Sequence, residues 1–375
     1  MSRERNEHRE PLIHLSKRSE ITPLKAWGIR LAAIVLGMLF CGLVAFLLIE
    51  KLQTNPARIG EFYGDFIKGA FGSARKVWRY LKDVAILLCI ALALTPAFRM
   101  RFWNIGGEGQ TLVGVLGCIG VSFYLGGKVP EWLLLILMLL AALACGALWG
   151  LLPALCKAKW GTNETLFTLM MNYIATYLVA FFLEIWVTNG SGALPQMKYG
   201  KLPTIGNEYL LVILIVLALT IGLYIYLKYT KQGYEISVVG ESVRTAQYIG
   251  INEKKVFLRT MILSGALCGL AGYLIGAGFD MSITTESAGG QGFTAIMVSW
   301  LAKFNPIGMI LTAGLIQMLN KGAGQITKDF DVPGQLPNVI IGIILFFIIG
   351  CEFFINYEVH FRGHTGSKAE KGVTK

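Results

Sequence analysis

Two short segments combine residues that could do chemistry with a strongly apolar surrounding sequence. The first is FRMRFWNIGGEGQ (residues 98–110), in which Asn104, Glu108 and Gln110 stand among three glycines. Amide and charged side chains are costly inside a bilayer, so those present usually face protein or a water-filled pathway. Non-helical backbone inside a bilayer is likewise tolerated only where protein or a water-filled cavity surrounds it. The segment predicts a broken helix beside a transport pathway or, equally well, a plain cytoplasmic turn between two helices.

The second segment covers residues 157–182, in which every fourth residue is polar: Glu164, Thr168, Asn172 and Thr176. This spacing keeps the four residues on one face of a helix, and polar side chains on a spanning helix point into the bundle. They either line a pathway or bond neighbouring helices, and the threonines can bond carbonyl groups of their own helix. We interpret Asn172 as a pathway residue and the threonines as structural.

The remaining reactive residues do not indicate catalysis or metal binding. The four histidines lie in the terminal regions, and the seven cysteines fall in or beside apolar segments without CxxC spacing. The sequence has neither G-x-x-x-x-G-K-[ST] nor G-x-G-x-x-G, the glycine patterns of nucleotide-binding loops. We therefore expect no catalytic residue, no metal site and no cofactor bound by this chain, and we interpret the protein as a non-enzyme.

The elements that must position these residues are membrane-spanning helices. The chain has 375 residues, of which 54% are hydrophobic and 15% charged. Its apolar residues form long blocks, and crossing a hydrocarbon core takes about 20 residues of helix. The blocks cover residues 31–49, 84–98, 111–125, 133–156, 166–183, 209–227, 256–279, 293–302, 306–320 and 334–351. They predict an all-α polytopic membrane protein with about ten transmembrane helices, one of them broken or re-entrant.

Lysine and arginine predict the orientation. We place the N-terminal tail (1–26), the loop 229–256 and the C-terminal tail (358–375) in the cytoplasm, around a membrane domain of residues 27–357. Most of the 34 basic residues then fall on the cytoplasmic side, when the basic residues beside these ranges and in the short inner loops are included: Arg30, Arg99, Arg101, Lys157, Lys159, Lys228, Arg259 and Lys303. This distribution accounts for the net charge of +11 without nucleic acid. The loop 51–82 disagrees, because it is basic yet predicted to be external. Its spaced aromatic residues suggest short amphipathic helices on the membrane surface.

The loop 229–256 contains a short amphipathic pattern from Glu241 to Ile249, bracketed by Gly240 and Gly250. Such a helix is either a solvated connector or an element that docks into a groove on a cytoplasmic partner. The helix after it repeats small residues, which predicts close helix packing. These are Gly265, Gly269, Gly272 and Gly276.

Four stretches of sequence together resemble a known family. They are FWNIGGEGQ, GTNETLFTLMMNYIA, GYEISVVGESVRTAQYIGI and GQGFTAIMVSWLAKFNPIG. In this order and spacing they resemble permease subunits of ABC importers for nucleosides and simple sugars, within the branched-chain amino acid and ribose permease family. The resemblance covers about residues 81–354. The chain departs from the family at Ser299–Ala302, where bulky Trp300 replaces the usual small packing.

The resemblance implies a nucleoside permease in a bacterial plasma membrane with both termini cytoplasmic. It implies three kinds of protein partner: a cytoplasmic ATPase that uses ATP and Mg²⁺, a second related permease in a heterodimer, and an extracellular or periplasmic binding protein or lipoprotein. It also implies two sets of functional residues. It places Asn104, Glu108 and Gln110 beside the translocation path, and it makes Glu241–Gly250 the coupling helix to the ATPase, with Glu241, Arg244, Thr245, Ala246, Tyr248 and Gly250. The polar helix face described above adds Glu164, Thr168 and Asn172 to the pathway candidates.

Other functions stay open at this stage. A simple-sugar permease of the ribose or galactose type fits the same motifs. An ion-coupled secondary transporter is less well supported, because it needs ionisable residues in the membrane and the few candidates lie near predicted helix ends. An intramembrane enzyme has the weakest support.

Glycine-broken segments around Gly106 and around Gly289, Gly290 and Gly292 suggest an internal repeat whose halves meet at the midplane.

Overall fold

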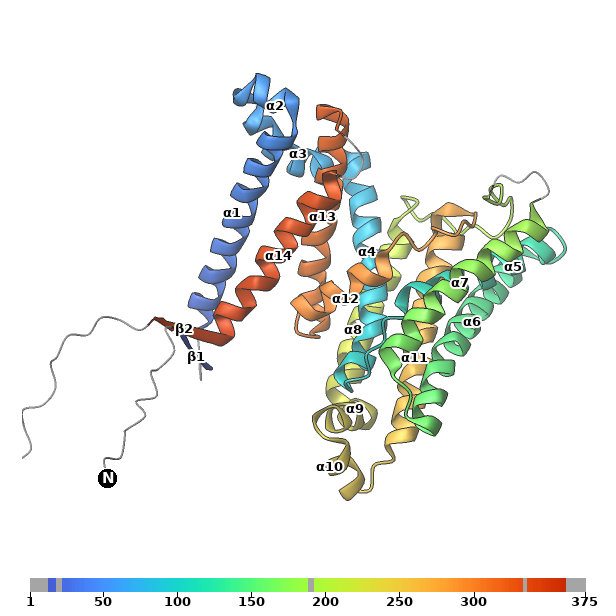
Figure 1. Ribbon diagram of the computed structural model, residues 1–375. Coiled ribbons are helices and arrows are strands. Elements are labelled where there is room, and N and C mark those ends of the chain that lie inside the picture. Colours follow the sequence, from blue (N-terminus) through green and yellow to red (C-terminus); the bar gives the residue numbers. More distant parts are fainter. Residues whose placement is uncertain (1–12, 18–21, 188–191, 333–335, 362–375) are drawn as a thin grey trace, which may run out of the picture. The chain divides into compact units, whose positions relative to one another are not determined.

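The computed structural model describes residues 13–17, 22–187, 192–332 and 336–361 (Figure 1). It divides into two compact units, residues 1–66 with 322–375 and residues 67–321. The predicted tails 1–26 and 358–375 lie largely outside the described residues. The all-α class is confirmed, with one addition: two short strands, β1 (Ile13–Lys17) and β2 (Tyr357–Phe361), pair antiparallel with Ile13 opposite Phe361.

The first unit joins the two ends of the chain. It holds α1 (Pro23–Leu48), α2 (Glu50–Thr54), a 3₁₀ turn (Pro56–Arg58), most of α3 (Ile59–Phe71), the end of α13 (Pro306–Phe330) and α14 (Leu336–Asn356). Helices α1 and α14 pack along each other, and Arg30 of α1 pairs with Glu352 of α14 at 2.7 Å. Pairing lowers the cost of placing these two charged side chains in spanning helices, because each charge is neutralised by the other.

The second unit contains the remaining elements. They are α4 (Ala74–Arg99), α5 (Gly107–Leu125), α6 (Glu131–Trp160), α7 (Glu164–Trp186), α8 (Leu210–Tyr229), α9 (Lys231–Glu241), α10 (Val243–Tyr248), α11 (Glu253–Ile275), a π turn (Gly276–Asp280), α12 (Gln291–Leu301) and the first part of α13. Helix α4 is the most deeply buried, while α6, α7 and α8 turn apolar faces outward. This burial pattern is expected for a bundle surrounded by lipid.

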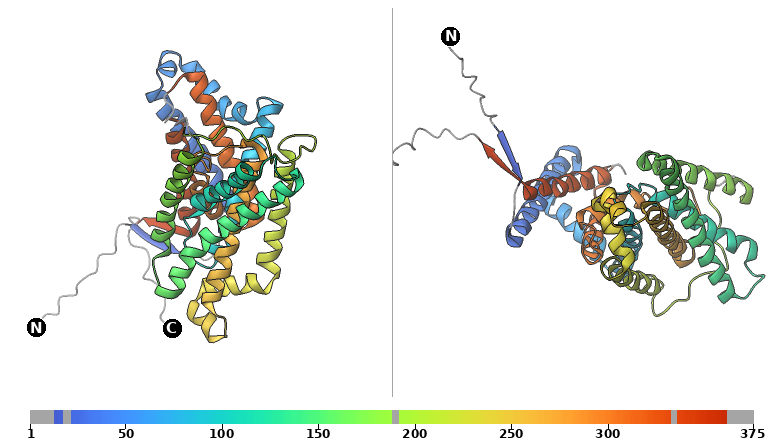
Figure 2. Two further views of the ribbon diagram at one scale, coloured as in Figure 1. Left: turned by 90° about the vertical axis from the view of Figure 1, so that its right-hand side faces the viewer. Right: turned by 90° about the horizontal axis from the view of Figure 1, so that it is seen from below.

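Close packing of small residues joins α5, α6 and α11 in the second unit (Figures 1 and 2). A methyl group at Gly265 would collide with the carbonyl oxygen of Gly146, and one at Gly269 with that of Ala142. The predicted glycine contacts are therefore confirmed at these positions. Backbones can approach this closely only where a side chain is lacking.

Eight helices of the described chain are long and apolar enough to span a membrane. Eight of the ten predicted segments correspond to them. The other two form α12, which has 11 residues, and the first part of α13. Predicted loop 51–82 is largely helical: α3 buries Phe62 and Phe66 on one face, and α4 already begins at Ala74. The side of the membrane on which it lies stays a prediction.

Candidate functional site

Residues 100–106 form a buried, irregular connection between two helices of the second unit. Helix α4 ends at Arg99, Arg101 adopts a left-handed conformation with φ 57°, and α5 begins at Gly107. Phe102 and Asn104 in the connection are 1% and 0% exposed. The connection thus joins two separate spanning helices and is partly buried, with Phe102 and Asn104 inside and Arg101 and Trp103 exposed, and its place beside a pathway stays a prediction. A buried connection must bond its backbone groups within the protein.

Asn104 and Gln110 close the connection from within. The Asn104 Oδ1 accepts hydrogen bonds from the backbone N–H of Gly106 at 3.0 Å and from Gln110 Nε2 at 3.2 Å. The Asn104 Nδ2 donates to Gln110 Oε1 at 3.3 Å and to Ser264 Oγ of α11 at 3.2 Å. Asn104 therefore connects the turn to α5 and α11 through both atoms of its amide.

Helix α7 supports the same connection from outside. The Asn172 Oδ1 accepts from the backbone N–H of Gly109 at 2.9 Å, and its Nδ2 donates to the carbonyl of Ile105 at 3.0 Å. The Thr168 Oγ1 accepts from the Ile105 N–H at 3.1 Å and donates to the Glu164 carbonyl at 2.7 Å. The turn depends on these side chains because residues 100–106 are not in a helix that could satisfy their backbone groups.

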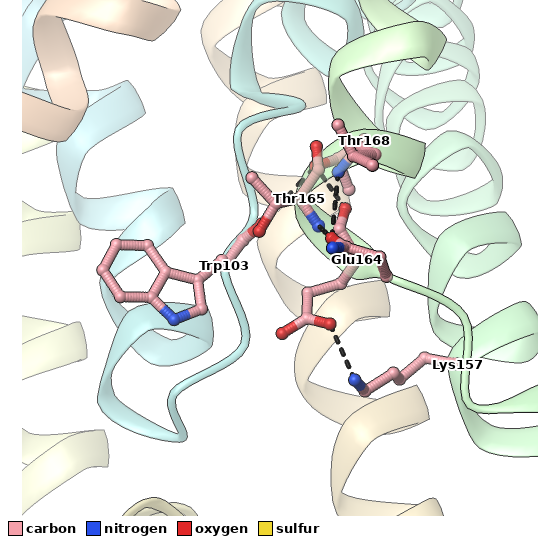
Figure 3. Close-up of polar contacts among 7 residues, drawn as sticks. Trp103, Lys157, Glu164, Thr165 and Thr168 are labelled. Atoms are coloured by element: carbon pink, nitrogen blue, oxygen red, sulfur yellow. Dashed lines mark hydrogen bonds and ion pairs between the residues drawn. The ribbon is translucent and has the colours of Figure 1, made fainter.

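The back-bonding predicted for the threonines is confirmed. Thr168 bonds the Glu164 carbonyl, and Thr176 bonds the Asn172 carbonyl at 3.1 Å. Figure 3 shows Thr168 in the second turn of α7 and Trp103 in the neighbouring connection. Thr176 is satisfied within its own helix, whereas Thr168 also contacts the connection.

Glu108 joins two helix N-termini. It lies in the first turn of α5, and its two carboxylate oxygens accept from the N–H groups of Gly290 and Gly292, each at 2.7 Å. Those glycines begin α12, so one carboxylate faces the positive ends of both helix dipoles. Gly290 has φ 71°, and a methyl group at Gly292 would collide with the Glu108 backbone. The two glycine-broken segments singled out in the sequence therefore meet here.

Glu164 stands apart from this group. Its carboxylate pairs with Lys157 of α6 at 2.7 Å (Figure 3). Asn163 caps α7 by accepting from the backbone N–H of Thr165. Five of the six pathway candidates therefore gather at one place, which we call the helix junction: residues 100–110, Thr168, Asn172 and Gly290–Gly292. Glu164 lies at the turn between α6 and α7 and contributes only its backbone carbonyl, to Thr168.

Aromatic side chains cover the junction on the side of α12. The rings of Trp103 and Trp300 stack with centroids 5.2 Å apart, and Phe98 and Phe304 pack around them. Trp103 and Trp300 are 45% and 46% exposed. The unusual Trp300 is thus part of a stacked pair and does not enter a small-residue packing site. Sequence reasoning missed this pair and also Ser264, because their partners come from distant parts of the chain.

Most of the predicted coupling helix forms α10, and only its first residue belongs to the preceding helix, α9. Glu241 is the last residue of α9, Ser242 caps α10 by accepting from Thr245 N–H at 3.2 Å, and Gly250 has φ 82°. The helix predicted from Glu241 to Ile249 is therefore wrong at its start. Ser242 is extended, so the chain leaves α9 there, and its hydroxyl caps the N-terminus of α10.

Helix α10 lies at the lower end of the second unit in Figure 1. All of its residues except one have exposed side chains. Tyr248 is 92% exposed and Ile249 is 50% exposed, and Arg244 and Thr245 are also exposed. Ala246 is the exception at 0% and faces the protein.

Residues 77–349 match the family model described as "Branched-chain amino acid transport system / permease component". The guanosine ABC transporter permease protein NupP of Bacillus subtilis is 30% identical over 328 residues, which cover 85% of this chain and 91% of that protein. The nucleoside ABC transporter permease protein NupB of Lactococcus lactis is 29% identical, covering 76% and 82%. The glucose ABC transporter permease protein TsgB13 of Haloferax volcanii is 28% identical, covering 87% and 88%.

Proposed function

Because this chain belongs to the family of branched-chain amino acid transport system permease components, we propose that it forms the translocation path of an ABC importer for nucleosides. The observation that carries the proposal is the similarity to two nucleoside permeases, NupP and NupB, over most of the chain. Hydrolysis of ATP with Mg²⁺ takes place in a separate ATPase, and this chain contributes no catalytic residue and binds no cofactor of its own.

The helix junction is the proposed wall of the path. Irregular backbone inside a membrane domain needs protein or an aqueous cavity around it, and discontinuous helices that meet inside a membrane domain are typical of transport sites. The amides of Asn104, Gln110 and Asn172 are engaged with each other or with the backbone. We therefore assign them to shaping the wall, with Thr168, while Glu108 holds α12 in place. The Glu108 carboxylate accepts from two backbone N–H groups, so the amides and this carboxylate are already bonded and a neutral solute can bind weakly and leave.

Helix α10 is the proposed coupling element. Closure of an ATPase dimer can move the permease only through an element that is accessible at the surface of the membrane domain. Helix α10 is such an element, because Tyr248 and Arg244 are exposed on it. The α9–α10 turn packs on α4 and α11, which adjoin the helix junction. Movement of α10 can therefore reach the junction through packed helices.

The complete importer consists of this chain, a second related permease, a cytoplasmic ATPase and an external substrate-binding protein. The family description, a permease component of a transport system, supports such an assembly. We place the chain in a bacterial plasma membrane with both termini in the cytoplasm, on the basis of its basic loops. The lower end of the second unit, where α10 projects, also carries Arg101, Lys159, Lys254 and Lys255 as exposed side chains.

Simple-sugar import is the second candidate, because the glucose permease TsgB13 also matches most of the chain. One experiment separates the two. The tagged complex is purified from native membranes in mild detergent, its subunits are identified by mass spectrometry, and it is reconstituted with its binding protein. Uptake of labelled guanosine, uridine, glucose and ribose is then measured with ATP and without it.

We expect uptake of guanosine or uridine that requires ATP and is not reduced by excess glucose. Uptake of glucose or ribose alone would replace the nucleoside proposal with the sugar candidate. Uptake driven by an ion gradient in the absence of ATP and of an ATPase subunit would contradict the importer function.

A further inference from the structure

A cleft of about 220 Å³ lies between the α9–α10 turn and the connection that joins α4 to α5. Residues 239–243 of the turn and residues 100–102 of the connection line it. Lys157 of α6, Glu164 of α7 and Phe257 of α11 complete the lining. The proposed coupling element and the helix junction therefore face a common space, and a change in its width would move one relative to the other.

Gly240 brings the two segments into direct backbone contact at this cleft. It lies in α9, and a methyl group on its Cα would collide with the carbonyl oxygen of Arg99, the last residue of α4. The same methyl group would lie 3.2 Å from the Cα of Met100. Two backbones approach this closely only where one residue lacks a side chain. The α9–α10 turn and the connection therefore touch at Gly240.

The chain leaves helical geometry close to this contact on both sides. Ser242, two residues after Gly240, is extended with φ −158° and separates α9 from α10. Arg101, two residues after the end of α4, is left-handed with φ 57°. A small rotation about Gly240 can therefore change the width of the cleft without breaking a helix.

Four charged side chains line the cleft: Lys157, Glu164, Arg101 and Glu241. The Lys157 Nζ and a Glu164 carboxylate oxygen are paired at 2.7 Å. Arg101 and Glu241 are exposed, and within the described part of the chain neither forms an ion pair. They carry opposite charges and lie within two residues of the Gly240 contact, at a chain reach of about 3.6 Å per residue. Their long side chains can meet when the cleft narrows.

From this geometry we propose that the cleft closes during transport and that Arg101 then pairs with Glu241. The proposal rests on the proposed function, because the movement of α10 by an ATPase is what closes the cleft. An interaction shifts a two-state equilibrium only if it differs between the states, and this ion pair forms only in the closed one. Gly240 is the pivot. Closure moves Arg101 and the connection that Asn104 anchors, so α10 reaches the helix junction through one direct contact.

Charge reversal tests the ion pair. The importer is purified with R101E, E241R or both substitutions in this chain, and ATP-dependent uptake of labelled guanosine is measured in proteoliposomes. Each single reversal should lower uptake by roughly tenfold, since coupling between sites changes an equilibrium by about 5–150-fold. R101E/E241R restores opposite charges and should recover most of the uptake. K159E is the matched control, because Lys159 is an exposed cation at the end of α6 that does not line the cleft.

Rescue by the double variant is a result that a merely structural role would not produce. Failure of R101E/E241R to recover uptake would overturn the proposal, as would a loss in K159E as large as that in R101E. Copurification of the ATPase is measured in the same preparations. Loss of the ATPase from E241R without rescue in the double variant would assign Glu241 to the ATPase interface and overturn the ion pair.

Cross-linking measures closure independently of the solute. R101C/E241C should form a disulfide roughly tenfold faster with ATP and vanadate than without nucleotide, as read by mass spectrometry of the linked peptides. K159C/E241C is the control pair and should show no such dependence. A rate for R101C/E241C that does not depend on nucleotide, while the unmodified importer takes up guanosine, would overturn this proposal alone. Nucleotide-dependent cross-linking without guanosine uptake would support closure and contradict the nucleoside substrate.

Discussion

The helix junction and helix α10 use polar residues in opposite ways. At the junction, Asn104, Thr168 and Asn172 are buried and bond the backbone of a connection that has no helix to satisfy it. On α10, Arg244 and Tyr248 are exposed, and their side chains extend away from the unit. Polar residues of the first kind hold a shape, and those of the second kind are available to a partner. Substitutions should therefore affect stability in one region and coupling in the other.

Asn172→Leu should have the largest effect on stability. Leucine is similar in size but leaves the Gly109 N–H and the Ile105 carbonyl without their partners. Each buried unsatisfied group costs about 1–3 kcal/mol, so we expect a loss of roughly 2–4 kcal/mol in the free energy of unfolding. Thermal unfolding in detergent measures it, with Thr176→Val as the control on the same helix face. A stable Asn172→Leu protein that fails only in uptake would instead make Asn172 a solute-binding residue.

Glu108→Ala comes next. It removes the acceptor of both glycine N–H groups at the start of α12, and losing a helix cap costs about 0.5–2 kcal/mol. Glu108→Gln keeps one acceptor oxygen, so its loss should be smaller. Hydrogen exchange at Gly290 and Gly292 reports the change locally. Unchanged protection in Glu108→Ala would show that α12 does not depend on this carboxylate.

Glu164→Gln should have a small effect. The Lys157–Glu164 pair is partly exposed, with 29% and 13% of the side chains accessible, and pairs near a surface contribute about 0–1 kcal/mol. We expect a loss of less than about 1 kcal/mol, decreasing with added salt. The unfolding midpoint at low and high salt tests this. A loss as large as that of Asn172→Leu would place Glu164 within the helix junction after all.

Tyr248→Ala should leave stability unchanged and still prevent coupling. Its side chain is almost fully exposed, so truncation removes no packing within this chain. We expect the unmodified unfolding midpoint together with loss of ATP-dependent uptake and of copurifying ATPase. Ala246→Glu is the contrasting variant, because Ala246 is 0% exposed and a buried charge there destabilises the fold. Normal uptake by Tyr248→Ala would remove α10 from the coupling role.

The contrast between Ala246 and Tyr248 also shows what sequence reasoning missed. Both residues belonged to the predicted coupling helix, and nothing in their local pattern separates a contact residue from a packing residue. The helix starts two residues later than the pattern suggests, at Val243, because Ser242 is extended and caps α10. Only the packing of α9 and α10 on the bundle decides which face is buried.

Local composition was sufficient to determine the membrane class and most spanning segments, and it marked residues 98–110 as irregular polar sequence between two apolar blocks. Long apolar blocks are stable as helices in the hydrocarbon core of a membrane. Irregular polar backbone between such blocks has to be surrounded by protein or water. The family could also be predicted, because its motifs are contiguous in the chain. The back-bonding of Thr168 and Thr176 was predictable for the same reason, since each bond stays within one helix.

Only the tertiary structure decided what the polar residues contact. Glu108 lies 182 residues before Gly290, and Asn104 lies 160 residues before Ser264, so neither pairing has a local signal. The same holds for the Trp103–Trp300 stack, because one ring comes from the connection 100–106 and the other from α12. Hydrophobic patterning determines that helices enter the membrane. Which side chains then meet depends on how glycine-lined helices pack, and that packing brings together residues far apart in the sequence.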